Sequence, residues 1–124
     1  MKLKSLKLII LFLVFALQAC NKIEHIGPDV FRVTFVGPSN GCPGGPLVRV
    51  GKNDIDRLAH LLDVTFSEGF HSQRVISAVN LKGSYREAQT LTVKIRQFTS
   101  DDAPICTANV PWYLGVYVIE EYAD

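Results

Sequence analysis

The chain has 124 residues, of which 20% are charged and 48% are hydrophobic, and its formal net charge is +1 at pH 7. A chain of this length accommodates one domain with a single modest core. The near-zero net charge excludes the strongly basic composition that is typical of nucleic-acid-binding domains.

Residues 1–19 have the features of a secretory signal peptide. Three lysines lie within the first seven residues, and no acidic residue occurs before Glu24. The apolar run Leu8–Leu17 is ten residues long, whereas a membrane-spanning helix needs about 20 apolar residues. A positive start followed by a short apolar run predicts an exported protein.

The sequence Leu17-Gln18-Ala19-Cys20 resembles the lipobox of bacterial lipoproteins. It places an aliphatic residue three positions before the cysteine and a small residue directly before it. In that family the cysteine thiol receives a diacylglyceryl thioether, the chain is cut before the cysteine, and the new amino group is acylated, for example with palmitate. The resemblance implies that Cys20 carries a lipid anchor. The alternatives are an ordinary signal peptide with a free Cys20 thiol, or an uncleaved anchor.

Cleavage before Cys20 would divide the chain into a signal peptide at 1–19, a lipidated cysteine with a polar tether at 20–29, and a domain at 30–124. It removes three lysines and no acid, so the net charge changes from +1 to −2. Asn21 favours the outer over the inner membrane of the cell envelope, on either the periplasmic or the surface face. The expected partners are the membrane, through Cys20, and an envelope protein or glycan, but not nucleic acid.

Two cysteines, Cys42 and Cys106, remain after Cys20 is lipidated. An even number of cysteines in an oxidising compartment predicts a disulfide between them. A metal pair and two free thiols are the alternatives. No histidine lies within a few residues of either cysteine, and two ligands are too few for a structural zinc site.

Alternation of hydrophobic and polar residues predicts five short strands. The clearest alternation places Leu91, Val93 and Ile95 on one face, with Thr92 and Lys94 on the other. The predicted strands cover residues 30–36, 47–50, 74–79, 90–98 and 112–120.

The segments between these strands have different characters. Residues 37–46 contain four glycines and three prolines, which excludes regular structure. From Asn53 to Phe66 the hydrophobic residues follow helical spacing, and Asn53 is a candidate cap. We therefore expect one helix that ends before Gly69, and one further helical turn at 85–89.

Five short strands around one core predict a mainly β protein with one short helix, built as a small five-stranded OB-like barrel. A two-sheet β-sandwich is the alternative. The layout resembles small bacterial lipoproteins of unknown function, which share a lipobox, a Gly-Cys turn after the first strand, a segment like 79–98 and a cysteine before the last strand. The resemblance covers most of the mature chain. It implies an OB-like barrel, with a disulfide between the loops flanking the first and last strands, but no activity.

The sequence contains no convincing catalytic set, cofactor motif or metal site. The G-x-S-x-G match around Ser39 lacks the helix that must follow it in hydrolases, because Pro43 comes too soon. Asp101-Asp102 is far from a complete Ca²⁺ cage. Metal-ligand spacing is not found among the histidines, and nothing pairs two carboxylates for acid–base chemistry. These residues are His25, His60, His71, Glu68, Glu87, Glu120 and Glu121.

Four aromatic residues are the candidate binding residues, because large rings can stack on a sugar or anchor a protein partner. They are Tyr85, Trp112, Tyr113 and Tyr117. Basic residues are expected on the outer faces of strands, with an anion or polysaccharide groove as the alternative; these are Arg32, Arg49, Arg74, Lys94 and Arg96.

The expected function is therefore a non-catalytic module that binds a protein or glycan at the envelope. The alternative is an inhibitor of an envelope-attacking hydrolase, with Ser39–Pro46 as the inserted loop. A functional loop should be exposed, whereas a structural loop should pack on the barrel. An enzyme would require a pocket that unites two or three of Ser39, His71, Glu87 and Asp101.

Overall fold

The structure is a computed structural model that describes residues 26–102, 106 and 109–122. The expected signal peptide and the lipobox cysteine Cys20 lie outside these residues. The expected domain at 30–124 lies almost entirely within them.

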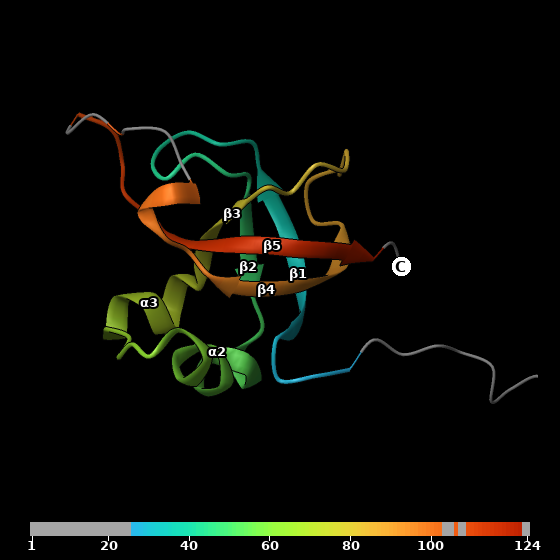
Figure 1. Ribbon diagram of the computed structural model, residues 1–124, viewed down its shortest axis with the longest axis vertical. Helices are drawn as coiled ribbons and strands as arrows, with labels where there is room; N and C mark the ends of the chain where they lie inside the picture. Colours follow the sequence, from blue (N-terminus) through green and yellow to red (C-terminus); the bar gives the residue numbers. More distant parts are fainter. Residues whose placement is uncertain (1–25, 103–105, 107–108, 123–124) are drawn as a thin grey trace, which may run out of the picture.

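The described chain forms a closed barrel of five strands in the order β1-β2-β3-β5-β4 (Figure 1). Neighbouring strands are antiparallel except β3 and β5, whose parallel pairing closes the barrel. The prediction of a small five-stranded OB-like barrel is thus confirmed, and the alternative sandwich is not formed. The strands are β1 (Val30–Gly37), β2 (Leu47–Val50), β3 (Val75–Val79), β4 (Thr90–Gln97) and β5 (Leu114–Tyr122).

The core follows the alternation of each strand. Leu91, Val93 and Ile95 of β4 are all buried, as the sequence predicts, because successive side chains of a strand point to opposite faces. Helix α2 and the segment after β3 add further apolar side chains. The core consists of Phe31, Val33, Val48, Val50, Leu58, Leu62, Ile76, Ala78, Leu81, Leu91, Val93, Ile95, Val116 and Val118.

The sequence predicts one helix over 53–66, but the helix in the structure is shorter and is preceded by a 3₁₀ turn. A 3₁₀ turn, η1 (Lys52–Asp54), leads into α2 (Ile55–Leu62). Asn53 therefore lies within the 3₁₀ turn and is not the cap. Helix α2 ends at Asp63, which adopts a left-handed conformation with φ of 53° and donates its N–H to carbonyls of the last turn.

A second helix, α3 (Glu68–Gln73), follows where the sequence analysis expected none. Ser67 caps it by accepting a hydrogen bond from the N–H of Phe70 at 3.3 Å. Gly69 consequently lies inside this helix and does not end the preceding one. The rings of Phe66 and Phe70 stack with centroids 4.0 Å apart and pack against the core. Helices α2 and α3 lie below the barrel in Figure 1.

Two other boundaries differ from expectation. Residues 86–89 form a turn in which Gln89 N–H donates to the carbonyl of Arg86, and Ala88 has a φ of 67°, which is incompatible with a helix. The last strand starts at Leu114, not at Trp112, which instead forms an isolated bridge with Cys42. A second 3₁₀ turn, η2 (Ser100–Asp102), follows β4.

Arg57 on α2 ties the start of the domain to the barrel. Its guanidinium donates to the carbonyls of Gly27 at 2.9 Å and Val30 at 2.6 Å, and lies 4.0 Å from the ring centroid of Phe31. It also pairs with Asp54 at 3.1 Å. A planar, permanently charged group can make these contacts together, whereas a lysine ammonium cannot.

We expect Arg57→Met to lower the free energy of unfolding by about 1–2 kcal/mol, because two backbone carbonyls lose a charged donor. Urea denaturation of the two proteins measures this difference. Lys52→Met, which removes an exposed charge from η1, serves as the matched control and should change stability by less than about 0.5 kcal/mol. Equal effects of the two substitutions would contradict the assigned role of Arg57.

Candidate binding surface

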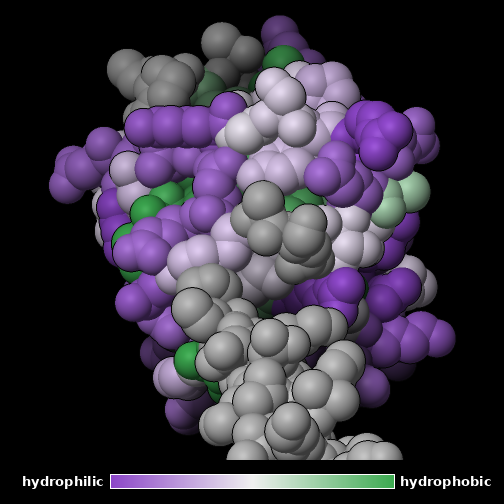
Figure 2. Space-filling view, turned by 90° about the vertical axis from the view of Figure 1, so that its right-hand side faces the viewer, coloured by the Kyte–Doolittle hydropathy of each residue, from purple (hydrophilic) through white to green (hydrophobic). Residues whose placement is uncertain are grey.

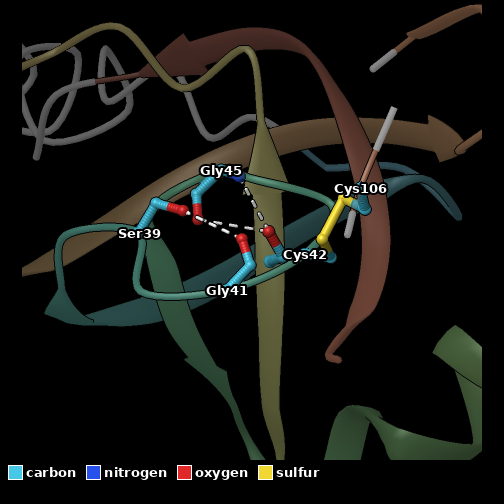
Figure 3. The surroundings of a disulfide bond; sticks show 6 residues. Ser39, Gly41, Cys42, Gly45 and Cys106 are labelled. Atoms are coloured by element: carbon cyan, nitrogen blue, oxygen red, sulfur yellow. Dashed lines mark hydrogen bonds between the residues drawn. A yellow bond between two sulfur atoms is a disulfide. The ribbon is translucent and has the colours of Figure 1, made fainter. Parts of the chain in front are cut away.

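The loop between β1 and β2 lies on the outer wall of the barrel, over β3. The N–H of Gly45 donates to Ser77 Oγ at 2.9 Å, and Ser77 Oγ donates back to the carbonyl of Gly45 at 3.1 Å (Figure 3). The N–H of Ala78 donates to the carbonyl of Pro46 at 2.8 Å. Ser77 points outward from the barrel, yet it is only 1% exposed because the loop covers it.

This packing requires small residues on both surfaces. A Cβ at Gly45 would overlap the backbone of Ala78 and Val79, so only glycine permits this approach. At Gly115, on the neighbouring strand β5, a Cβ would meet Pro43 Cγ at 2.5 Å. The loop therefore packs on the barrel from Cys42 to Gly45, and only Gly44 in this stretch is exposed. The sequence signal for this packing is Ser77, a small residue at an outward-facing strand position.

Cys42 fixes this loop to the segment that precedes β5. It forms a disulfide with Cys106, with Cα atoms 6.0 Å apart, in agreement with the expected pairing (Figure 3). Beside it, Cys42 N–H donates to the carbonyl of Pro111, and Tyr113 N–H donates to the carbonyl of Cys42, both at 2.8 Å. The residues on both sides of Trp112 are therefore hydrogen-bonded to Cys42, and these bonds fix the backbone of Trp112 in space.

Of the four candidate aromatic residues, only Trp112 is strongly exposed, at 65%. Tyr113 is half-buried, and its ring edge lies near Gly41. The exposed residues that accompany Trp112 on these two segments are Ser, Asn, Pro and Gly residues. We call five residues of the two segments together the Trp112 surface, which consists of Ser39, Asn40, Asn109, Pro111 and Trp112.

The Trp112 surface lies away from the point where the N-terminal segment leaves the barrel. In Figure 1 residues 109–113 are at the upper left, beside the 38–46 loop, whereas residues 26–29 depart at the lower right. Seen from that right-hand side, the described residues present a mainly hydrophilic face with only small, separate hydrophobic patches (Figure 2). This face does not offer the continuous apolar area that marks many docking sites.

Tyr85 has an internal role. Its ring packs against Phe35 with centroids 6.0 Å apart, and its hydroxyl donates to Glu121 at 2.7 Å. Glu121 also accepts from the backbone N–H groups of Lys82 at 2.8 Å and Gly83 at 2.6 Å. Burial would raise the pKa of Glu121, but these three hydrogen bonds outweigh it and lower that pKa. Burial, and then the bond to Glu121, raises the pKa of Tyr85 to about 12.

Tyr117 is also engaged within the molecule. The guanidinium of Arg96 lies 3.9 Å from its ring centroid and donates two hydrogen bonds to Asp102, at 2.8 and 2.9 Å. These bonds from Arg96, and next the bond from the N–H of Thr99, hold the pKa of Asp102 well below its usual range. Asp102 is thus an ion-pair partner of Arg96.

The remaining candidates occupy separate places. Ser39 donates to the carbonyl of Gly41 at 3.4 Å, while His71 lies in α3 and Asp101 in η2. Figure 1 places α3 and the loop that carries Glu87 on opposite sides of the barrel.

Within the described ranges, no group of three or more His, Cys, Asp or Glu side chains could hold a metal ion. Nor does any helix in those ranges have the length and hydrophobicity to cross a membrane.

Three of the basic residues contact groups on neighbouring elements. Arg74 caps α3 and donates to the carbonyl of Val50, and Lys94 pairs with Asp29 at 3.9 Å. Arg49 donates to the carbonyl of Gln73 at 3.3 Å. These contacts support the expectation that the basic side chains belong to the outer faces and ends of the elements.

No family model, curated protein or solved structure matches this chain at a significant level. Its function must therefore be inferred from its residues and their arrangement.

We expect Gly45→Ala to destabilise the protein by about 1–3 kcal/mol, because the added methyl group forces the loop away from β3. Gly37→Ala is the matched control, since a Cβ there would meet nothing within 4 Å. Chemical denaturation compares the two. A Gly45→Ala protein as stable as the control would show that the loop does not depend on this close approach.

The bond between Tyr85 and Glu121 predicts a pH-dependent contribution to stability. Because the pKa of Glu121 is lowered from 4.5, its contribution is present above pH 4.5 and is lost as the pH falls below that value. Because the pKa of Tyr85 is raised from 10.0 to about 12, its contribution is lost as the pH rises between these values. Tyr85→Phe should therefore cost about 1 kcal/mol near neutral pH, and less at either extreme.

Urea denaturation across this pH range tests the expectation for Tyr85→Phe. Tyr113→Phe, which removes a tyrosine hydroxyl from a different part of the barrel, is the control. A difference between wild type and Tyr85→Phe that stays constant from acid to alkaline pH would contradict the assigned hydrogen bond.

Proposed function

We propose that this chain is a lipid-anchored protein of the bacterial cell envelope, and that its barrel presents the Trp112 surface to an envelope protein or glycan. The exposure of Trp112 on a backbone held by the Cys42 segment is the observation that carries the binding part. The sequence Leu17-Gln18-Ala19-Cys20 carries the anchor.

Tryptophan is enriched among the residues that dominate the binding energy of protein interfaces. The other three candidate aromatic residues contribute to packing, to the Glu121 bond or to the Arg96 contact. Trp112, at 65% exposure, has most of its ring area available. Two flanking backbone hydrogen bonds reduce the entropy that binding would cost, because the segment is already ordered.

The position of the surface fits an anchored protein. Residues 26–29 and the Trp112 surface lie at different ends of the barrel in Figure 1. A lipid on Cys20 would hold the chain by its N-terminal side, so this arrangement leaves the Trp112 surface accessible to a partner.

The inhibitor alternative has less support. Cys42, Pro43 and Gly45 are buried on the barrel wall, whereas a loop that enters the active site of a hydrolase must protrude. The exposed residues of the proposed inserting loop are Ser39, Asn40 and Gly44. The buried packing of this loop therefore favours the interpretation that it holds the backbone around Trp112 in place and does not enter a partner's active site.

The anchor is tested by the intact mass of the protein extracted from native membranes. We expect the mass of residues 20–124 plus acyl chains, and two thiols that react with alkylating reagent only after reduction. An unacylated mass would overturn the anchor. Thiols that react without reductant would overturn the pairing of Cys42 with Cys106.

Binding is tested by photocrosslinking of the anchored protein in its own envelope. A photoreactive amino acid at Asn109, on the Trp112 surface, should give a saturable adduct that is lost in the Trp112→Ala variant. The same amino acid at Glu87, in the turn before β4, is the control. Equal adducts from both positions, or adducts that persist in Trp112→Ala, would overturn the binding role of this surface. Circular dichroism verifies that the variant is folded.

A further inference from the structure

We propose that the Trp112 surface binds an uncharged glycan, with one sugar ring stacked on the indole of Trp112 and with hydrogen bonds from the neighbouring hydroxyl and amide groups. This inference rests on the proposed binding function and assigns it a ligand class. Three properties of the described residues support it: two segments without charged residues, an exposed indole ring, and polar uncharged neighbours on the same segments.

The two segments that build the surface carry no charge. Residues 38–46 and 109–113 contain no Asp, Glu, Lys or Arg, although 20% of the residues in the chain are charged. Arg96 and Asp102, which lie on the elements before the second segment, form an ion pair with each other. These two segments therefore offer no charged side chain to a phosphate or a uronic acid, and a neutral ligand that binds them displaces no water from a charged side chain of theirs.

The exposed indole matches one face of a sugar. On many pyranose rings one face carries mainly C–H groups, and these groups pack on the electron-rich face of an aromatic ring. Trp112 is 65% exposed and is the single tryptophan of the chain. Its neighbours Pro111 and Tyr113 are fixed by hydrogen bonds to Cys42, so the indole is attached to an ordered backbone before any ligand binds.

The polar neighbours of Trp112 are neutral donors and acceptors. Ser39, Asn40 and Asn109 are exposed, and their hydroxyl and amide groups can both donate and accept hydrogen bonds. Asn40 precedes Gly41, whose backbone lies against the carbonyl of Pro111, so the two segments run side by side. Sugar hydroxyls also donate and accept, so these groups complement them without an ionic contact.

A surface that binds a protein partner usually exposes more apolar area than the Trp112 surface does. The centre of a protein interface usually combines several large apolar side chains. Apart from Trp112, the large hydrophobic residues most exposed in the described ranges are Ile26, Val64 and Ile119. They lie before β1, after α2 and near the end of β5, and so do not extend the Trp112 surface. A single ring among Asn, Ser and Pro favours a sugar.

The test uses the purified mature domain without its lipid and a panel of tetrasaccharides. The neutral probes are oligomers of glucose, mannose, galactose and N-acetylglucosamine, and the charged probe is an oligomer of galacturonic acid. Trp112 fluorescence reports binding directly in the wild type, and isothermal titration calorimetry reports it in the variants. We expect saturable binding of at least one neutral probe and none of the charged probe.

Three variants locate the site. Trp112→Ala should weaken binding of the neutral probe by at least about tenfold, which corresponds to about 1.4 kcal/mol. Trp112→Phe retains a ring and should lose less affinity, whereas Ile119→Ala removes an exposed apolar side chain elsewhere and should bind as wild type does. Equal affinity of Trp112→Ala and wild type would overturn the site.

The outcomes separate this inference from the proposed function. If no neutral probe binds but photocrosslinking at Asn109 captures an envelope protein in a Trp112-dependent manner, the glycan assignment is overturned and the binding function stands. If the galacturonic acid oligomer binds better than every neutral probe, the assignment is overturned as well. If neither a probe nor a crosslinked partner depends on Trp112, both proposals are overturned.

Discussion

The close packing of the β1–β2 loop on β3 and β5 determines the arrangement of the rest of the surface. Gly45 and Ser77 exchange hydrogen bonds at a distance that a side chain on Gly45 would prevent. This contact places Cys42 against the segment before β5, and Cys42 in turn fixes Trp112 outside the barrel. The sequence pattern places Trp112 in the last strand, whereas in the structure it lies before that strand and its side chain is exposed near Cys42.

Several charged side chains stabilise the fold by joining one segment of the chain to another. Arg57 fastens the start of the domain, Glu121 fastens the loop before β4, and Arg96 with Asp102 fastens the turn after it. These charged residues support the fold, whereas Trp112 is an exposed aromatic side chain on a segment at a different end of the barrel from residues 26–29.

The sequence predicts the strands better than the connections between them. The alternation around Leu91 and Val93 depends only on the two-residue repeat of a strand, so it could be interpreted without the fold. The ends of the helices depend on single residues that adopt left-handed backbone conformations, Asp63 after α2 and Arg74 after α3, and their sequence gives no clear sign of this. The cap at Ser67 was available as a signal, because serine is a preferred N-cap residue.

The candidate site was predictable only in part. Trp112 was among the aromatic residues expected to bind, and Cys42 and Cys106 were expected to pair. The internal role of Tyr85 was not predictable, because it depends on Glu121, which is 36 residues away along the chain. The separation of Tyr117 from Trp112 likewise depends on where β5 begins, and this is decided by the bridge between Cys42 and Trp112.

The lack of charged residues at 38–46 and 109–113 also has a kinetic consequence. A surface without charge gains no electrostatic steering, so a partner must meet it at an ordinary association rate, but that rate should also be insensitive to ionic strength. Confinement by a lipid anchor would compensate, because it raises the effective concentration of the surface near any ligand held in the same envelope. Such a protein would retain its partner through large changes in external salt, to which the outermost layers of a bacterial cell are directly exposed.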